Sequence, residues 1–206
     1  MAIREPVRKR ASKPTWEIAR LFPHQGDWTE AEYLELDTNQ LVEFTDGYLE
    51  FLPMPTQSHQ FIVMYLYRQL WAFVTERKLG QVLAAPLRIY IRPRKYREPD
   101  LLFMATEHDA RRGEQYWHGA DLVMEVVSPD DPDRDYVKKR KEYAQAGIAE
   151  YWIIDPSQQL ITVLTLNEEA YQAHGVFKPG TQATSVLLPG FALHVNEVLT
   201  AAFRAA

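Results

Sequence analysis

The chain has 206 residues, of which 46 % are hydrophobic and 12 % aromatic, so it is long enough to fold around its own core and lacks the composition of a disordered protein. It contains no cysteine, which excludes disulfides, thiolate nucleophiles and cysteine-bound zinc. The net charge of −5 argues against strong nonspecific binding of nucleic acid, because such binding depends on neutralising phosphates. The sequence shows neither the apolar core of a signal peptide nor an apolar run that could span a bilayer, and we expect a cytoplasmic protein.

The N-terminal segment is rich in basic side chains, namely Arg4, Arg8, Lys9, Arg10 and Lys13. Polar, basic termini of this kind are commonly flexible. The sequence therefore predicts a flexible basic arm over 1–27 and a single domain over 28–206. A second basic group precedes Asp100 in the chain. It supplies the candidate DNA contacts Arg92, Arg94, Lys95 and Arg97.

Two helices are expected in the first half of the domain. Thr29 and Glu32 have the spacing of a capping box, which predicts a short helix that ends near Leu36. Ser58 is the expected N-cap of a longer helix, and Gly80 is expected to end it. The apolar residues of this longer helix recur at helical spacing and are Ile62, Leu66, Leu70 and Phe73.

A β-hairpin is predicted between these helices, over Leu41–Leu52. Asp46 and Gly47 form the dipeptide that favours a two-residue type I′ turn. Counting outward from that turn places Glu43 opposite Glu50. Two facing glutamates repel each other, so we expect water, a basic neighbour or a cation between them.

Three strands are predicted next, over Val82–Ile91, Pro99–Met104 and Ala120–Val127. The last two are almost continuously apolar, which is typical of strands buried on both faces of a sheet. Asp100 and Glu125 interrupt them. A carboxylate in such a place is costly unless a positive group meets it.

The remaining predicted elements are a helix over Asp133–Ala146 closed by Gly147, strands over Glu150–Ile154, Leu160–Leu166 and Tyr171–Phe177, and a short C-terminal helix capped by Asn196. In the middle of the chain the order is thus helix, three strands, helix, strand. This order predicts an α/β (α+β) fold, with a mixed sheet and a helix on each of its faces.

The two strand carboxylates predict a cation site. Residues two apart in a strand share a face, so Asp100 points with Leu102 and Glu125 points with Val127. If the two strands are neighbours, Asp100 and Glu125 converge at one end of the sheet. Two carboxylates and a backbone carbonyl, such as that of Val126, match the way Mg²⁺ is usually held. Such an ion would polarise a phosphoryl oxygen and activate water.

A lysine from the following helix is expected at the same point. At 100° per residue, the buried arc of that helix consists of Tyr136, Val137, Tyr143, Ala144 and Ala146. Lys139 lies at one edge of this arc, where its ammonium could orient an attacking water or balance charge on phosphorus. Arg140 lies on the same side and is the rival for this role.

Structural interpretations compete with these roles. Lys139 could bury only its aliphatic stem and keep its charge in water. Asp100 could accept a hydrogen bond at the start of its strand. Glu125, in the middle of an apolar run, has no comparable structural explanation.

Several segments together resemble a known family. They are 41–47 (LVEFTDG), 58–60 (SHQ), 98–103 (EPDLLF), 121–129 (DLVMEVVSP) and 139–156, which runs from Lys139 through YAQAG to EYWIIDP. The chain resembles, from about Glu30 onward, the bacterial "putative restriction endonuclease" family, long catalogued as a domain of unknown function. That family lies within the PD-(D/E)XK nuclease-like superfamily.

The resemblance implies an αβββαβ core with a metal-dependent phosphodiesterase site. Pro99 and Asp100 stand at the PD position, and Glu125 stands at the (D/E) position. The lysine expected two residues later is replaced by Val127. The family is thought to take its lysine from the following helix, and Lys139 fits that migrated position.

The resemblance also implies a third corner for the site, from an acidic or histidine residue near the first core helix. His59 occupies that region, and Glu43 is the nearest matching acid. The identity of this third residue stays open between the two.

These patterns predict a Mg²⁺-dependent endonuclease acting on DNA, with Mn²⁺ as a substitute and no membrane partner. A homodimer would supply the two sites that cutting a duplex requires. The alternative is a catalytically inactive nucleic-acid-binding or regulatory module on the same fold. A glycosidase with two carboxylates is a weaker alternative, because it gives no reason for an inward Lys139.

Overall fold

The computed structural model describes residues 22–38 and 40–203, so most of the predicted arm over 1–27 lies outside the described residues. The last residues of that segment pack against the hairpin. The side-chain amide of Gln25 donates to the carbonyl of Leu49 at 3.0 Å and accepts from its N–H at 2.8 Å. The N–H of Gly26 donates to the carbonyl of Gly47. Gln25 and Gly26 of the predicted arm thus contact the hairpin, and the domain boundary at residue 28 stays a prediction.

The helical elements are α2 (Glu30–Leu34), α3 (Gln57–Arg77), the 3₁₀ helix η1 (Thr106–Arg111), the π-helix η2 (Arg134–Lys139), α4 (Arg140–Gln145) and α5 (Val195–Ala201). Over the described ranges, none of them combines the length and the apolar character that crossing a membrane requires. The strands are β1 (Val42–Thr45), β2 (Tyr48–Phe51), β3 (Gly80–Ala84), β4 (Arg88–Arg92), β5 (Lys95–Arg97), β6 (Leu101–Ala105), β7 (Tyr116–His118), β8 (Leu122–Val126), β9 (Glu150–Asp155), β10 (Leu160–Asn167), β11 (Ala170–Phe177), β12 (Gln182–Thr184) and β13 (Ala192–His194).

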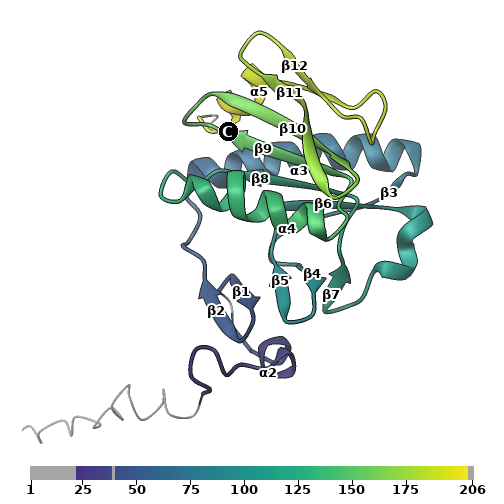
Figure 1. The fold of residues 1–206 in the computed structure, drawn as a ribbon. Coiled ribbons are helices and arrows are strands. Elements are labelled where there is room, and N and C mark those ends of the chain that lie inside the picture. Colours follow the sequence, from purple (N-terminus) through teal and green to yellow (C-terminus); the bar gives the residue numbers. More distant parts are fainter. Residues whose placement is uncertain (1–21, 39, 204–206) are drawn as a thin grey trace, which may run out of the picture.

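The predicted mixed α/β core is confirmed in its element order, α3, β3, β6, β8, η2–α4 and β9. Within the described residues these strands belong to a six-stranded sheet in the order β11-β10-β9-β8-β6-β3, and a five-stranded sheet runs β2-β1-β5-β4-β7. β8 pairs with β9 in parallel and with β6 in antiparallel fashion, which makes the larger sheet mixed. In Figure 1, α3 crosses one face of this sheet and α4 crosses the other.

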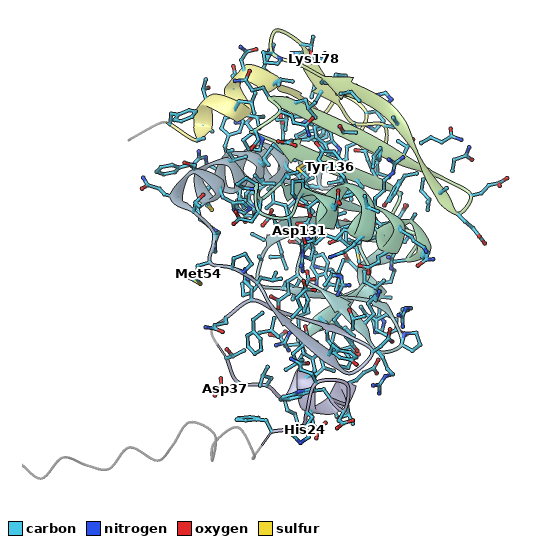
Figure 2. All side chains as sticks on the ribbon, turned by 60° about the vertical axis from the view of Figure 1, so that its left-hand side comes forward. His24, Asp37, Met54, Asp131, Tyr136 and Lys178 are labelled. Carbon is cyan, nitrogen blue, oxygen red and sulfur yellow. The ribbon has the colours of Figure 1, made fainter. Side chains whose placement is uncertain are left out.

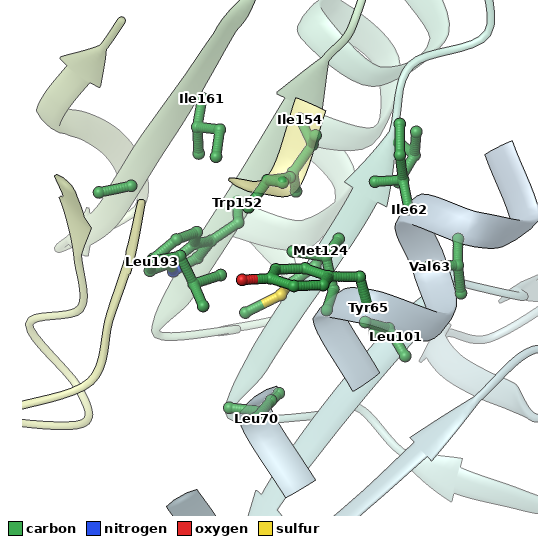
Figure 3. Close-up of a cluster of buried hydrophobic side chains, with 14 of the residues drawn as sticks. Ile62, Val63, Tyr65, Leu70, Leu101, Met124, Trp152, Ile154, Ile161 and Leu193 are labelled. Atoms are coloured by element: carbon green, nitrogen blue, oxygen red, sulfur yellow. The ribbon is translucent and has the colours of Figure 1, made fainter. Parts of the chain in front are cut away.

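β6 and β8 are buried on both faces, as their continuous apolar character predicts. One face packs on α3, and Figure 3 shows part of that cluster, with labels on Ile62, Tyr65, Leu70, Leu101, Met124 and Trp152. The opposite face of the same strands packs under α4 through Leu102, Val123 and Val127. Asp100 lies two residues before Leu102, and Glu125 lies two residues from both Val123 and Val127. Both carboxylates therefore belong to the face under α4.

The hairpin forms with the predicted register. Glu43 pairs with Glu50 across β1 and β2. Asp46 and Gly47 have φ values of 51° and 94°, the positive values that a type I′ turn requires. β1 also pairs with β5, which joins the hairpin to the smaller sheet.

The predicted strand over Val82–Ile91 is wrong, because the chain divides there into β3 and β4, which belong to different sheets. Pro86 lies between them and has no N–H to donate to a sheet. β3 instead approaches β6 closely at Gly80, where a Cβ atom would lie 2.0 Å from the carbonyl oxygen of Met104. Gly80 therefore serves this close approach rather than ending α3.

The helix caps differ from the predicted ones. Thr56, not Ser58, caps α3 by accepting a hydrogen bond from the N–H of His59 at 3.2 Å. At the C-terminus, α5 begins after His194, and Asn196 lies inside the helix, where its side chain accepts a hydrogen bond from the N–H of Gly180. The capping box of Thr29 and Glu32 on α2 is confirmed.

The helix predicted over Asp133–Ala146 consists of a π-helical turn, η2, followed by α4. The wider turn changes which residues face the sheet. Val137, expected inside, is 60 % exposed, whereas Asp135 is 4 % exposed. Because π-helical turns are rare and often occur at functional sites, this departure marks the segment that carries Lys139.

A buried carboxylate attaches the C-terminal part of the chain to the larger sheet. Glu150, at the start of β9, has no exposed surface. One of its oxygens accepts from the indole of Trp152 and the hydroxyl of Ser185, both at 2.6 Å. The other accepts from the N–H groups of Val186 and Leu187, at 2.7 and 2.8 Å. Four donors thus satisfy one carboxylate.

Replacing Glu150 with alanine is expected to lower the free energy of unfolding by about 3 kcal/mol or more, because several buried donors lose their acceptor at once. Urea denaturation measures this loss. Glu169→Ala, an exposed glutamate in the turn between β10 and β11, is the matched control and should change stability by less than about 0.5 kcal/mol. Equal stability of the two variants would contradict this anchoring role.

Candidate active site

Asp100 and Glu125 lie side by side on neighbouring strands. β6 and β8 are antiparallel with Leu101 opposite Met124, so the next position places Asp100 opposite Glu125. The N–H of Val126 donates to Oδ2 of Asp100 at 2.8 Å, and the N–H of Asp100 lies 3.4 Å from Oε2 of Glu125. The predicted convergence of the two carboxylates is confirmed.

Lys139 meets Glu125 from η2. Its Nζ lies 2.8 Å from Oε1 of Glu125, and its side chain is only 5 % exposed. The rival Arg140 is exposed and donates instead to the carbonyl of Tyr171 on β11, at 3.2 Å. Of the two candidates, Lys139 alone therefore contacts the site, and its ammonium does not extend into solvent.

Asp135 is a third buried acid at the site, and the sequence-based prediction missed it. Its Oδ1 lies 3.3 Å from Nζ of Lys139 and has no hydrogen-bond partner among the described residues. Tyr136, labelled in Figure 2, marks the helical turn that carries both side chains. The signal was available in the spacing of four residues between an acid and a lysine, which places them on one helix face.

Tyr143 holds Glu125 from α4. Its hydroxyl donates to Oε1 of Glu125 at 2.5 Å. The ring is fully buried and packs edge-on against Tyr151, with centroids 5.1 Å apart. Tyr143 was predicted as part of the apolar arc, which is confirmed, but its hydrogen bond to the site could not be inferred from that arc.

Of the two candidates for the third corner, His59 lies at the site. Its Nε2 is 3.2 Å from Oδ2 of Asp100, and its Nδ1 is buried without a hydrogen-bond partner in the described part of the chain. Glu43 belongs instead to an adjoining ion-pair network. It pairs with Arg97 at 3.4 Å and also with Arg134.

Arg134 is the basic neighbour expected between the facing glutamates of the hairpin. Its guanidinium pairs with both Glu43 and Glu50. Arg134 begins η2, so the turn that carries Asp135 and Lys139 is also attached to the hairpin.

The predicted DNA contacts need a correction. Arg97 is 6 % exposed and pairs with Glu142, which lies on α4, at 2.7 Å. Lys95 pairs with the same carboxylate at 2.6 Å. Arg97 is therefore buried in an ion pair, and Lys95 shares the single charge of Glu142 with it. Arg92 and Arg94 lie near the surface, where Arg92 pairs with Asp46.

Comparison with known proteins assigns the chain to a family. A model described as "Uma2: Putative restriction endonuclease" matches residues 30–196. The chain belongs to the Uma2 family. The matched region contains Asp100, Glu125, Asp135, Lys139 and Tyr143. No curated protein matches the chain.

The Uma2-family fold has a counterpart among solved structures. A crystal structure described as that of "a putative nuclease belonging to DUF820", from Anabaena variabilis ATCC 29413, matches with a TM-score of 0.71. The two chains are 19 % identical, and the match covers 85 % of this chain and 99 % of the other. At this identity the likeness establishes the fold alone.

Burial and charge shift the pKa values at the Uma2-family site. Burial raises the pKa of Glu125 to about 8, where Lys139 opposes the shift and Asp100 and Asp135 add to it. Burial alone would lower the pKa of Lys139, but the carboxylates of Glu125 and Asp135 outweigh it and raise this pKa. Lys139 therefore stays protonated at neutral pH. Glu125 and Asp135 thus lie within 2.8 and 3.3 Å of the same ammonium, and Asp100 lies beside Glu125.

The donor set fits a divalent cation of the magnesium type. Among the described residues, no three His, Asp or Glu side chains are arranged to hold a metal ion by themselves. Mg²⁺ does not need such a cage, because one or two carboxylates usually hold it while waters and substrate phosphates complete its coordination. Asp100 and Glu125 would supply that pair, while Oδ1 of Asp135 makes no hydrogen bond within the described residues and lies 3.3 Å from the ammonium of Lys139.

Glu98, just before the Pro99–Asp100 pair, serves the structure. It is 4 % exposed, pairs with Arg88 at 3.4 Å and accepts a hydrogen bond from the N–H of Val42. Burial raises its pKa to about 7, although the charge of Arg88 opposes this shift.

This shift predicts a pH-dependent stability. Because Glu98 binds its proton more tightly in the folded protein than at its ordinary pKa of 4.5, the folded state should lose stability as the pH rises from about 4.5 to above 7. The variant Glu98→Gln cannot ionise at this position and is the reference. Relative to it, the free energy of unfolding of the wild type should fall by on the order of 2 kcal/mol across this pH range. Urea unfolding at several pH values measures the difference. Parallel pH profiles for the two proteins would refute the shift.

Proposed function

We propose that this protein is a metal-dependent endonuclease that hydrolyses phosphodiester bonds of DNA. The observation that carries the proposal is the meeting of two carboxylates from adjacent strands, Asp100 and Glu125, with the buried ammonium of Lys139. Membership in the family described as "Putative restriction endonuclease" supports the reaction class.

Each residue of the site has a distinct role in the proposed reaction. Asp100 and Glu125 would hold Mg²⁺, or Mn²⁺ in its place, with the backbone carbonyl of Val126 as the proposed further ligand. A bound divalent cation polarises a phosphoryl oxygen and makes water a stronger nucleophile. Because Lys139 stays protonated, its role is to donate hydrogen bonds, orienting the attacking water and balancing the charge that develops on the phosphate. Asp135 would keep that ammonium inside the site.

His59 completes the rim of the site. Its Nε2 contacts Asp100, and the charge and hydrogen bond of Asp100 raise the pKa of the imidazole although burial alone would lower it. With side chains 18 % and 14 % exposed, Asp100 and His59 are more accessible than Glu125 and Lys139. This difference supports entry of the substrate phosphate on the Asp100–His59 side.

Single substitutions test the proposal. Lys139→Met, Asp100→Asn and Glu125→Gln should each reduce the nicking of supercoiled plasmid in Mg²⁺ or Mn²⁺ by about 100-fold or more, because each removes a group that acts on the transition state. Lys141→Met changes an exposed lysine of α4, two residues after Lys139, and should leave the rate unchanged. Equal cleavage by the wild type and all three site variants would refute the proposal, because none of the three side chains would then be needed for the reaction.

One observation favours a second candidate, a nucleic-acid-binding or regulatory module without turnover. Oε1 of Glu125 already accepts from Lys139 and Tyr143, and Oδ2 of Asp100 accepts from Val126 and contacts His59. A cluster satisfied in this way could serve stability alone. Binding of labelled DNA that is independent of Mn²⁺ and yields no product would favour this candidate.

Sedimentation of the DNA complex would test the proposed homodimer.

A further inference from the structure

The two oxygens of Glu125 have different environments. Oε1 accepts from the ammonium of Lys139 at 2.8 Å and from the hydroxyl of Tyr143 at 2.5 Å. Oε2 faces Asp100, whose N–H lies at the long distance of 3.4 Å. Two donors therefore hold Oε1, while Oε2 lies near the backbone N–H of Asp100 and has only this one long contact among the described residues.

The two donors to Oε1 are not equivalent. Lys139 divides its charge between Glu125 and Asp135, at 2.8 and 3.3 Å. The hydroxyl of Tyr143 donates to Glu125 alone, and its ring is fixed in the core against Tyr151. The last torsion of a glutamate side chain is broad, so a carboxylate held by one donor can still rotate. A second donor from a fixed direction restricts that rotation.

An apolar ring would suffice for packing at this position. Tyr143 belongs to the cluster of Leu102, Val123, Val127 and Ile153, in which a phenylalanine would bury similar surface. A hydroxyl buried there is costly unless it is hydrogen-bonded, and its acceptor is the Glu125 carboxylate. The hydroxyl therefore serves the hydrogen bond to Glu125 and is not required for packing of the core.

We propose that Tyr143 is a positioning residue: its hydroxyl fixes the Glu125 carboxylate so that Oε2 stays turned toward Asp100 and open to a divalent cation. This inference rests on the proposed metal-dependent function. Tyr143 touches neither substrate nor metal and acts through Glu125. Hydrogen-bonding partners of this kind orient metal-binding carboxylates, and their loss usually weakens metal binding by about 10- to 100-fold.

Calorimetric titration of the full-length protein with Mn²⁺ alone tests the proposal. Tyr143→Phe removes only the hydroxyl and should weaken Mn²⁺ binding by about 10-fold or more. The matched control is Tyr171→Phe, because the buried hydroxyl of Tyr171 donates to the carbonyl of Ile148 at 2.7 Å, away from the site. It should lose similar stability and keep the affinity of the wild type.

A second readout separates positioning from a general loss of structure. In Tyr143→Phe, the Mn²⁺ concentration for half-maximal plasmid cleavage should rise by the same factor as the dissociation constant, while the rate at saturating Mn²⁺ stays close to that of the wild type. Lower rates at every Mn²⁺ concentration with unchanged affinity would overturn the proposal.

The Glu125→Gln variant separates the positioning role of Tyr143 from the proposed metal-dependent function. One result would leave the proposed function standing and refute the positioning role. In that result the wild type and Tyr143→Phe bind Mn²⁺ equally tightly, and Glu125→Gln does not bind it. If the wild type gives no heat with Mn²⁺, or Glu125→Gln binds as the wild type does, the proposed function fails and this inference fails with it.

Discussion

The ammonium of Lys139 is the charge on which the centre of this structure depends. It lies within 2.8 Å of one buried carboxylate, that of Glu125, and within 3.3 Å of another, that of Asp135. Without it, these acids and the neighbouring Asp100 would face one another in an apolar sheet and helix interface. Leaving a buried charge unpaired costs several kcal/mol. The ion pairs of Lys139 therefore also allow the folded protein to keep these acids buried.

Much of this arrangement could be predicted from local patterns. The continuous apolar runs of β6 and β8 place both strands in the interior, and the two-residue period then puts Asp100 and Glu125 on one face. The hairpin register follows from the Asp46–Gly47 turn alone. These inferences succeeded because each depends on residues close together in the chain. The catalytic roles of Asp100, Glu125 and Lys139 stay predictions.

Other features depend on geometry that local patterns do not contain. A helical wheel at 100° per residue placed Val137 inside, because it assumed an α-helix where the chain forms a π-helical turn. Arg97 was predicted to contact DNA because it lies in a basic stretch, yet it pairs with Glu142, 45 residues later. Only the packing of α4 beside β5 reveals that pairing.

The π-helical turn also joins the hairpin to the site. Arg134 pairs with Glu43 and Glu50, while Asp135 and Lys139, from the same turn, reach inward. The positive charges near the hairpin are therefore used to balance acids of the hairpin and of α4. At the centre, Glu125 and Asp135 share the ammonium of Lys139. His59 contacts Asp100 and adds charge only when protonated. A further lysine would have to be buried, at the cost of removing its charge from water. The proposed divalent cation would instead add positive charge beside Asp100 without that cost to the folded chain.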